Sequence, residues 1–269
     1  MRRFWILILL ASMFCGISLR ANLENASAGN PAYSIIEYPS INTAIVDGQW
    51  TTGDEWTDTP ATPLTGNATG MFGYNIQDFT NLGLEWIIEI FTDNTNDADD
   101  YWQICLDNNN TGGTAPDTWD FKIEIIGHTT LKVYRGTGTG WTEITPLPGE
   151  ITWSNKIAPS PWNSTPHWIL EIVDSSKVQG NVQVPNPPPT GMRIAAYDAH
   201  TRTLAAWPPD SKADVPDEWG VIPTFSMTPI SENTNLLAAI LLSSITIAII
   251  LQKSRKIRLL SYTPEIIEK

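Results

Sequence analysis

The sequence predicts an all-β protein, an antiparallel β-sandwich followed by a single transmembrane helix. Short apolar segments alternate with loops rich in Gly, Pro, Asn and Asp, and several segments alternate apolar and polar residues with a period of two. Between the two apolar ends of the chain, no segment keeps helical periodicity over the roughly 12 residues of a typical helix. The third observation is an uncharged apolar segment near the C-terminus, which predicts the membrane helix.

The clearest strand covers residues 119–125, where four apolar residues alternate with three charged ones. The apolar residues are Trp119, Phe121, Ile123 and Ile125. Such a face must be covered by a second sheet. Strand parity also places Trp86, Trp119 and Trp168 in the core.

The other strands are predicted from similar patterns. Residues 84–91 are almost continuously apolar, which indicates a central strand. Strands are also predicted at residues 101–106 and 168–173. Two hairpins are predicted, one pairing 131–134 with 140–144 and one pairing 193–198 with 202–207.

The two ends of the chain predict export and membrane anchoring. Arg2 and Arg3 precede an apolar run, the layout of a secretory signal peptide, here residues 1–21. Residues 235–252 are long enough to span a bilayer, and the basic residues that follow predict a cytoplasmic tail, 253–269. We therefore expect a single-pass protein of the cell membrane with its N-terminal domain outside.

The remaining ranges complete the predicted organisation. Residues 22–39 form an irregular lead-in, 40–226 the sandwich and 227–234 a spacer. Between Asn22 and Thr234 there are 27 acidic and 8 basic residues, a balance that excludes nucleic acid as a partner. Cys105 is the only cysteine in this part, so no disulfide can form within it.

An acidic loop and the end of the next strand carry the candidate ligands for calcium. These are Asp93, Asp97, Asp99, Asp100 and Asp107. Ala98 and Ile104 stand where an EF-hand needs Gly and Glu, so an EF-hand is excluded. An irregular calcium site and a solvated loop without metal both remain open.

Tryptophan is unusually frequent, with 12 residues, and indole faces stack on pyranose rings. Four of these residues lie beside loops or polar neighbours and are candidates for an exposed binding platform. They are Trp102, Trp141, Trp162 and Trp207. Packing in the core is the competing interpretation for any of them.

Four Asn-X-Ser/Thr triplets are candidate glycosylation sites in an exported chain. They begin at Asn25, Asn67, Asn109 and Asn163. No enzyme constellation is apparent. His128, His167 and His200 are far apart in sequence and are expected on loops or the surface. Carboxylate pairs, such as Glu85 with Glu89, need a measured separation across a cleft before they indicate a glycosidase.

Three motifs together resemble the family 9 carbohydrate-binding modules and the related DOMON-like sandwiches. They are VDGQWTTGDEW, WIIEIFTDNTNDADDYWQICLDNN and the closing GMRIAAYDAHTRTLAAWPPDSKADVPDEWGVI, and the resemblance covers residues 41–224. The resemblance implies a two-sheet sandwich of the jelly-roll type, often with calcium, that in some members holds a sugar between two tryptophans. Trp207 matches one wall of that slot.

We therefore expect a non-enzymatic, glycan-binding surface protein, with calcium as a candidate cofactor. A structural or adhesive surface module without sugar binding is the alternative. The resemblance also admits haem binding, for which axial ligands would come from histidine or methionine. The candidates are Met71, His128, His167, Met192 and His200.

Overall fold

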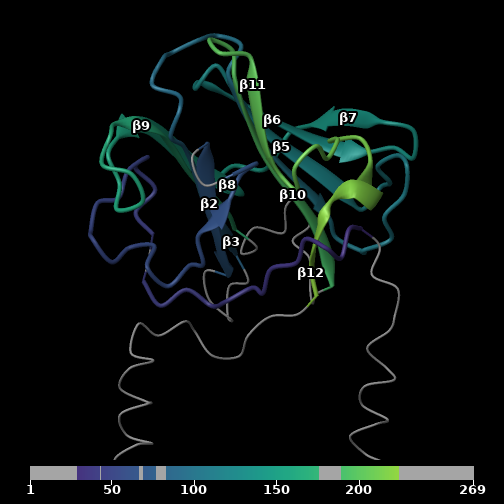
Figure 1. Ribbon diagram of the computed structural model, residues 1–269. Helices are drawn as coiled ribbons and strands as arrows, with labels where there is room; N and C mark the ends of the chain where they lie inside the picture. The colour runs from purple at the N-terminus through teal and green to yellow at the C-terminus, as the bar shows by residue number, and fades with distance from the viewer. Residues whose placement is uncertain (1–28, 43, 67–68, 77–82, 176–188, 224–269) are drawn as a thin grey trace, which may run out of the picture. The chain divides into compact units, whose positions relative to one another are not determined.

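The computed structural model describes residues 29–42, 44–66, 69–76, 83–175 and 189–223. In these ranges the chain forms two antiparallel β-sheets and a single 3-10 turn, η1, at Pro216–Glu218. Figure 1 shows β2, β3, β8 and β9 gathered on one side and β5, β6, β10 and β11 on the other. The prediction of an all-β sandwich is confirmed for this part of the chain.

The first sheet has the strand order β1-β2-β3-β9-β8. Its strands are β1 (Thr62–Pro63), β2 (Gly70–Ile76), β3 (Leu84–Ile90), β8 (Ile151–Ala158) and β9 (His167–Asp174). The predicted central strand, β3, lies between β2 and β9. A strand buried on both faces needs apolar or paired residues at every position, which explains its continuous apolar run.

The second sheet has the order β11-β10-β4-β5-β6-β7, and β12 pairs with β10. Its strands are β4 (Tyr101–Asp107), β5 (Asp120–Ile126), β6 (Thr130–Gly136), β7 (Trp141–Ile144), β10 (Thr190–Asp198), β11 (Thr203–Trp207) and β12 (Gly220–Ile222). Both predicted hairpins are confirmed, as β6 with β7 and β10 with β11.

The main core lies between the sheets, where alternate residues of each strand meet. Its largest side chains include Trp86 and Phe72 from the first sheet and Phe121 and Ile123 from the second. Trp86 and Trp168 are buried, as predicted, in the same core.

The predicted place of Trp119 in the core is wrong, because its side chain is 47% exposed. Trp119 stands one residue before β5 begins at Asp120. The alternation of the strand therefore does not reach it.

The outer face of the first sheet carries buried carboxylates. Glu85 and Glu89 of β3 and Glu171 of β9 are at most 1% exposed. A second apolar cluster, centred on Trp56 and Ile87, surrounds them. These glutamates therefore do not face a solvent-filled cleft, as a glycosidase pair would need to.

The N-terminal part of the sandwich is held on this face by those carboxylates. Glu171 accepts hydrogen bonds from the backbone N–H groups of Asp47 and Gly48, at 2.9 and 2.8 Å, and from Trp56 Nε1 at 2.9 Å. Glu89 accepts one from Trp50 Nε1 at 2.6 Å. The Asp-Gly turn and the tryptophans of the first motif thus serve as tethers.

Gly48 is required at this turn. Its φ is +82°, and a Cβ there would lie 2.6 Å from the backbone of Asn155 on β8. Only glycine combines that conformation with such close approach to a neighbouring strand.

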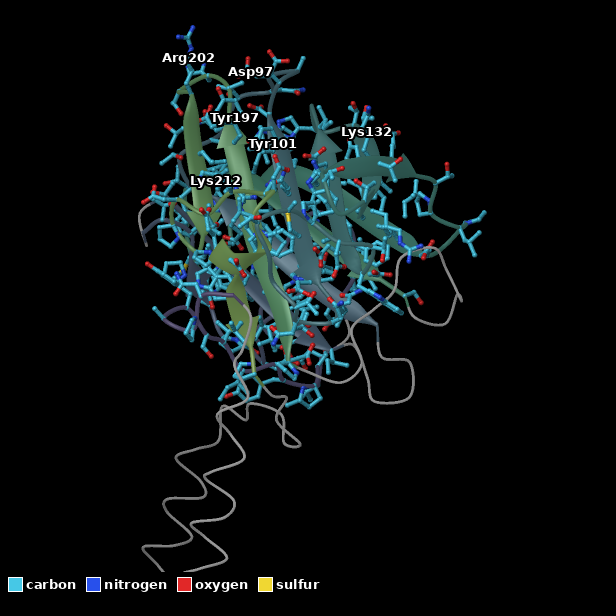
Figure 2. All side chains as sticks on the ribbon, turned by 90° about the vertical axis from the view of Figure 1, so that its right-hand side faces the viewer. Asp97, Tyr101, Lys132, Tyr197, Arg202 and Lys212 are labelled. Carbon is cyan, nitrogen blue, oxygen red and sulfur yellow. The ribbon has the colours of Figure 1, made fainter. Side chains whose placement is uncertain are left out.

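The outer face of the second sheet is polar and aromatic. Arg193 of β10 is buried and donates to Gln103, which in turn donates to Glu124 at 2.6 Å. The rings of Tyr101 and Tyr197 stack with centroids 5.3 Å apart, and Figure 2 shows the two side by side on this face. These interactions link β10 to β4 and β4 to β5 across the outer face.

Four strands, β1, β2, β8 and β12, and one bridging segment are not predicted from the sequence. Residues 70–76 and 151–158 form β2 and β8, although the sequence predicts no strand in either range. Residues 29–39 of the predicted lead-in run along the domain, where Ser34 bridges Val221 and Pro39 bridges Ile76. Such parallel bridges join distant parts of the chain and leave no local pattern.

The predicted signal peptide and membrane segment lie outside the described residues. Within the described ranges, no helix is both long and apolar enough to cross a membrane.

Candidate functional site

Trp207, at the end of β11, lines a small apolar pocket of about 210 Å³. The other lining residues are Tyr33, Thr62, Pro63, Thr65, Gly66 and Pro209. Trp207 itself is only 5% exposed, because its ring packs on Phe72 and directly over Gly220. Trp207 is therefore not the exposed binding platform that was predicted. Only the part of its indole that lines this pocket is accessible to a ligand.

A second, more polar pocket of about 260 Å³ adjoins the first at Pro209. It is lined by Asn30, Pro209, Asp210, Ser211 and Glu218. Hydrogen bonds from the Lys212 backbone and side chain hold the pKa of the Glu218 carboxyl below its usual value. The two pockets together offer aromatic and apolar surface next to amide, hydroxyl and carboxylate groups.

Non-local hydrogen bonds place the walls of these pockets. The Thr65 N–H donates to the Ala206 carbonyl at 2.9 Å, and the Ala206 N–H donates to Thr65 Oγ1 at 2.8 Å. On the other side, the Val221 N–H donates to the Tyr33 carbonyl at 2.8 Å. Residues 62–66, which comprise β1 and the three residues after it, and the lead-in are thereby fixed on either side of Trp207.

The other three candidate tryptophans do not join Trp207 at these pockets. Trp102 is buried in the core, 3% exposed, so its predicted exposure is wrong. Position 102 lies in β4 with its side chain on the inner face of the sheet. Trp162 and Trp141 are both half-buried, and Trp162 lies edge-on against Trp50.

Trp141 is nevertheless held rigidly. Its Nε1 donates to Asp214 at 2.7 Å, and its ring lies parallel to that of Trp219 at a centroid distance of 6.4 Å. It contributes to the polar face of the second sheet, where Lys122 lies 5.4 Å from its ring.

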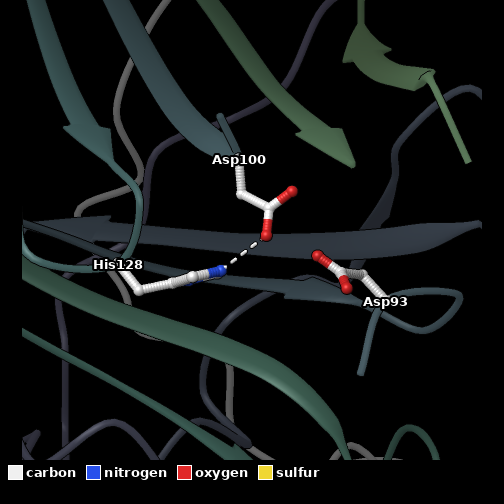
Figure 3. A group of neighbouring side chains, drawn as sticks. All are labelled: Asp93, Asp100 and His128. Atoms are coloured by element: carbon white, nitrogen blue, oxygen red, sulfur yellow. Dashed lines mark hydrogen bonds and ion pairs between the residues drawn. The ribbon is translucent and has the colours of Figure 1, made fainter. Parts of the chain in front are cut away.

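The acidic loop contributes to a compact group of metal-binding side chains. Asp93, Asp100 and His128 are all buried, and one potential ligand atom from each lies within 4.8 Å of the other two. Figure 3 shows the Asp93 carboxylate facing the Asp100–His128 pair. His128 Nε2 lies 2.8 Å from Asp100 Oδ2. Burial, reinforced by the charges of Asp100 and Asp198, raises the pKa of Asp93.

The expected loop or surface position is wrong for His167, which lies buried in β9, whereas His128 lies on a turn as expected but is buried. His128 occupies the turn between β5 and β6 with φ +60°, and its imidazole stacks on Trp168 at 3.7 Å. His167 is fully buried and contacts Glu89 at 2.9 Å. Each histidine is buried because a carboxylate accompanies it, and a pairing between distant segments leaves no spacing motif in the sequence.

The remaining calcium candidates are divided between two places. Asp97 is half-buried and Asp99 exposed in the same loop as Asp93. Asp107 ends β4, whereas Asp100 immediately precedes it, so the length of the strand, roughly 20 Å, separates the two. The five residues therefore do not form one site.

Asp107 instead pairs across the ladder with Asp120 of β5, and both are buried. Asp107 accepts hydrogen bonds from the N–H groups of Thr111 and Gly112, at 3.2 and 2.8 Å. Asp120 Oδ1 has no hydrogen-bond partner among the described residues. Burial, together with the charge of Asp107, raises the pKa of Asp120 to about 8. An all-oxygen pair of this kind suits a hard cation.

Two of the predicted glycosylation sites are described. Asn109 is exposed, and its side chain donates to Asp117 at 3.2 Å. Asn163 is half-buried, with its N–H donating to Ser160 Oγ at 3.1 Å. Asn25 and Asn67 lie outside the described residues.

The fold and these groups define an all-β sandwich with two adjoining pockets beside the end of β11. No family model matches the chain, and no curated protein matches it. Among solved structures, it is similar to a family 9 carbohydrate-binding module from Caldicellulosiruptor kristjanssonii. The complex of that module with cellotriose is 13% identical, with a TM-score of 0.47, over 75% of this chain and 96% of that one.

The glucose complex of the same module is 14% identical, with a TM-score of 0.48, over 75% of this chain and 99% of the other. These values are too low for function to be transferred from one protein to the other.

Proposed function

We propose that this chain is a non-catalytic surface protein that binds a short saccharide at the adjoining pockets around Pro209. The observation that carries the proposal is the junction of an apolar pocket, lined by Trp207 and Tyr33, with a polar one, lined by Asn30, Asp210 and Glu218. A sugar ring presents C–H groups on its faces and hydroxyls around its edge. It therefore needs both kinds of surface side by side.

The combined size limits the ligand. The pockets measure about 210 and 260 Å³, so each is smaller than a typical drug-sized site of about 300–1,000 Å³. One or two sugar units match this space better than the middle of a long polysaccharide. The acidic rim, with Asp210 and Glu218, favours neutral sugars over uronic or sulfated ones.

Binding of neutral oligosaccharides to the full-length chain, followed by calorimetry, tests the proposal. Tyr33→Ala and Glu218→Gln should each weaken binding by roughly 10-fold or more, since a hydrogen bond or stacking contact contributes about 1–2 kcal/mol. Trp207→Ala should abolish binding, but its ring also packs in the core, so Tyr33 and Glu218 decide the question.

Trp119→Ala is the matched control, because Trp119 is exposed and lines neither pocket. It should leave affinity unchanged. Loss of binding in Trp119→Ala with retention in Tyr33→Ala would place the site elsewhere. A chain that binds no saccharide but self-associates would favour the structural or adhesive alternative.

The non-catalytic part of the proposal is supported by the carboxylates. Glu89 and Glu171 are committed to hydrogen bonds that hold the N-terminal segment. Of the five candidate haem ligands, two are already engaged, since Met192 Sδ accepts a hydrogen bond from Trp86 and His167 contacts Glu89.

The proposed location rests on the sequence of the two ends. An exported N-terminus and the membrane segment 235–252 would present the pockets outside the cell. Removal of residues 235–269 should release the protein from the membrane fraction, and a truncated chain that stays there would contradict the anchor.

A further inference from the structure

We propose that Asp93, Asp100 and His128 bind a divalent transition-metal ion such as zinc. The three side chains offer two carboxylate oxygens and one imidazole nitrogen within 4.8 Å of one another. Calcium takes six to eight oxygen ligands, whereas an imidazole nitrogen beside carboxylates suits zinc and its neighbours. The histidine therefore distinguishes this site from a calcium loop.

The three ligands come from both sheets. Asp93 follows β3 of the first sheet, and its carbonyl accepts a hydrogen bond from the Trp168 N–H at 3.0 Å. Asp100 immediately precedes β4 of the second sheet, and His128 lies in the β5–β6 turn. A metal here would join the two sheets at one end of the sandwich.

Each ligand is already oriented. Stacking on Trp168, at 3.7 Å with planes 10° apart, fixes the plane of the His128 ring. Asp100 Oδ1 accepts a hydrogen bond from the Ala199 N–H at 2.8 Å, which directs Oδ2 toward the histidine. Both hydrogen bonds from Thr95 to Asp93 are accepted by Oδ1, so Oδ2 can act as a ligand without displacing them.

The charge balance also favours a cation. Asp93 and Asp198 are both buried, yet neither takes part in an ion pair within the described residues. The ion pair of His128 is with Asp100 and not with Asp93 or Asp198. A divalent ion would neutralise the two carboxylates that it binds.

The Asp100–His128 pair needs only a small adjustment to bind an ion, whereas the ligand atom of Asp93, within 4.8 Å of the other two, has to move closer. Nε2 and Oδ2 are 2.8 Å apart, with a proton between them. Bonds of about 2.0–2.1 Å in a tetrahedral site place two ligand atoms roughly 3.3 Å apart. The ion would take the place of that proton, and one or two waters would complete the coordination shell.

Titration of the full-length chain with Co²⁺, followed by visible absorption and calorimetry, tests the site, with Zn²⁺ as competitor. We expect one ion per chain. His128→Gln and Asp93→Asn should each weaken binding at least about 10- to 100-fold, the loss that even outer-shell changes cause. Asp93→Asn keeps the shape of the side chain and decides the question if His128→Gln does not fold.

His167→Gln is the matched control, because His167 is equally buried beside a carboxylate, Glu89. It should leave Co²⁺ binding unchanged. Absence of Co²⁺ and Zn²⁺ binding, binding of calcium alone, or equal affinity in Asp93→Asn and wild type would overturn the inference. The saccharide pockets share no residue with this site, so the two proposals fail or succeed separately.

Discussion

At the scale of single residues, buried carboxylates are the most unusual feature of this molecule. Glu85 on β3 is 1% exposed, and its Oε2 has no hydrogen-bond partner among the described residues. Burial raises the pKa of Glu85 to about 7, and the charges of Asp58, Glu55 and Glu171 add to the effect. The folded protein therefore favours the protonated form of this side chain.

Replacing Glu85 by Gln should stabilise the protein in mildly alkaline solution. Folding raises the pKa of this carboxyl from 4.5 to about 7. Its contribution to the free energy of unfolding is therefore fully present below about pH 4.5 and is lost as the pH rises through about 7. At about 1.4 kcal/mol per pKa unit, the gain above about pH 8 is limited to roughly 3 kcal/mol.

Chemical denaturation of wild type and Glu85→Gln at several pH values measures this effect. The difference in unfolding free energy should shrink toward zero near pH 4. Glu143→Gln, at an exposed ion pair with Lys132, should show no such trend. An equal difference at every pH would argue against the titration of Glu85.

At the scale of elements, the segment 41–58 depends on strands β3 and β9 for its position. Its described residues, 41–42 and 44–58, form no strand, and carboxylates rather than a β-ladder attach them. Within the segment, Glu55 accepts hydrogen bonds from the Ile45 and Thr51 N–H groups, at 2.5 and 2.8 Å. The residues of the motif VDGQWTTGDEW therefore have a structural role, which is to hold this segment on the first sheet.

Glu171→Ala should release this segment. Three donors, two of them backbone N–H groups, would lose their acceptor, and each buried unpaired donor costs about 1–3 kcal/mol. Limited proteolysis should then cut first near Asp47–Trp56. Glu143→Ala serves as the exposed control. Cleavage elsewhere in both variants at equal rates would show that the tether is unimportant.

At the scale of the whole molecule, oxygen-rich clusters lie at separate places on one acidic domain. The chain carries a net charge of −13, and Asp107 with Asp120 forms a pair suited to calcium. We propose that calcium at this pair stabilises the entire sandwich, because β4 and β5 are interior strands of the second sheet.

Calcium should raise the melting temperature of the full-length chain, and a chelator should lower it. Free calcium at 100 times its dissociation constant adds about 2.7 kcal/mol, or roughly 5–10 °C for a domain of this size. Asp120→Asn should abolish the calcium response, while His128→Gln should retain it. No shift in the wild type would remove this site from consideration.

The sequence by itself determined the class of fold, because periodicity and turn residues are local properties. The alternation after Asp120, the apolar run of β3 and the two hairpins can all be predicted from neighbouring residues. Segments without a clear alternation of apolar and polar residues cannot be predicted in the same way. For this reason β2 and β8 are not predicted from the sequence.

Only the tertiary structure decided which side chains meet. Strand parity places Trp102 on one face of β4, but only the opposing sheet shows that this face is the core. His128 joins Asp93 and Asp100 through a turn 28 residues from Asp100 along the chain. Tyr33 reaches Trp207 because the lead-in pairs with β12. Contacts between such distant segments arise from packing, and no local pattern encodes them.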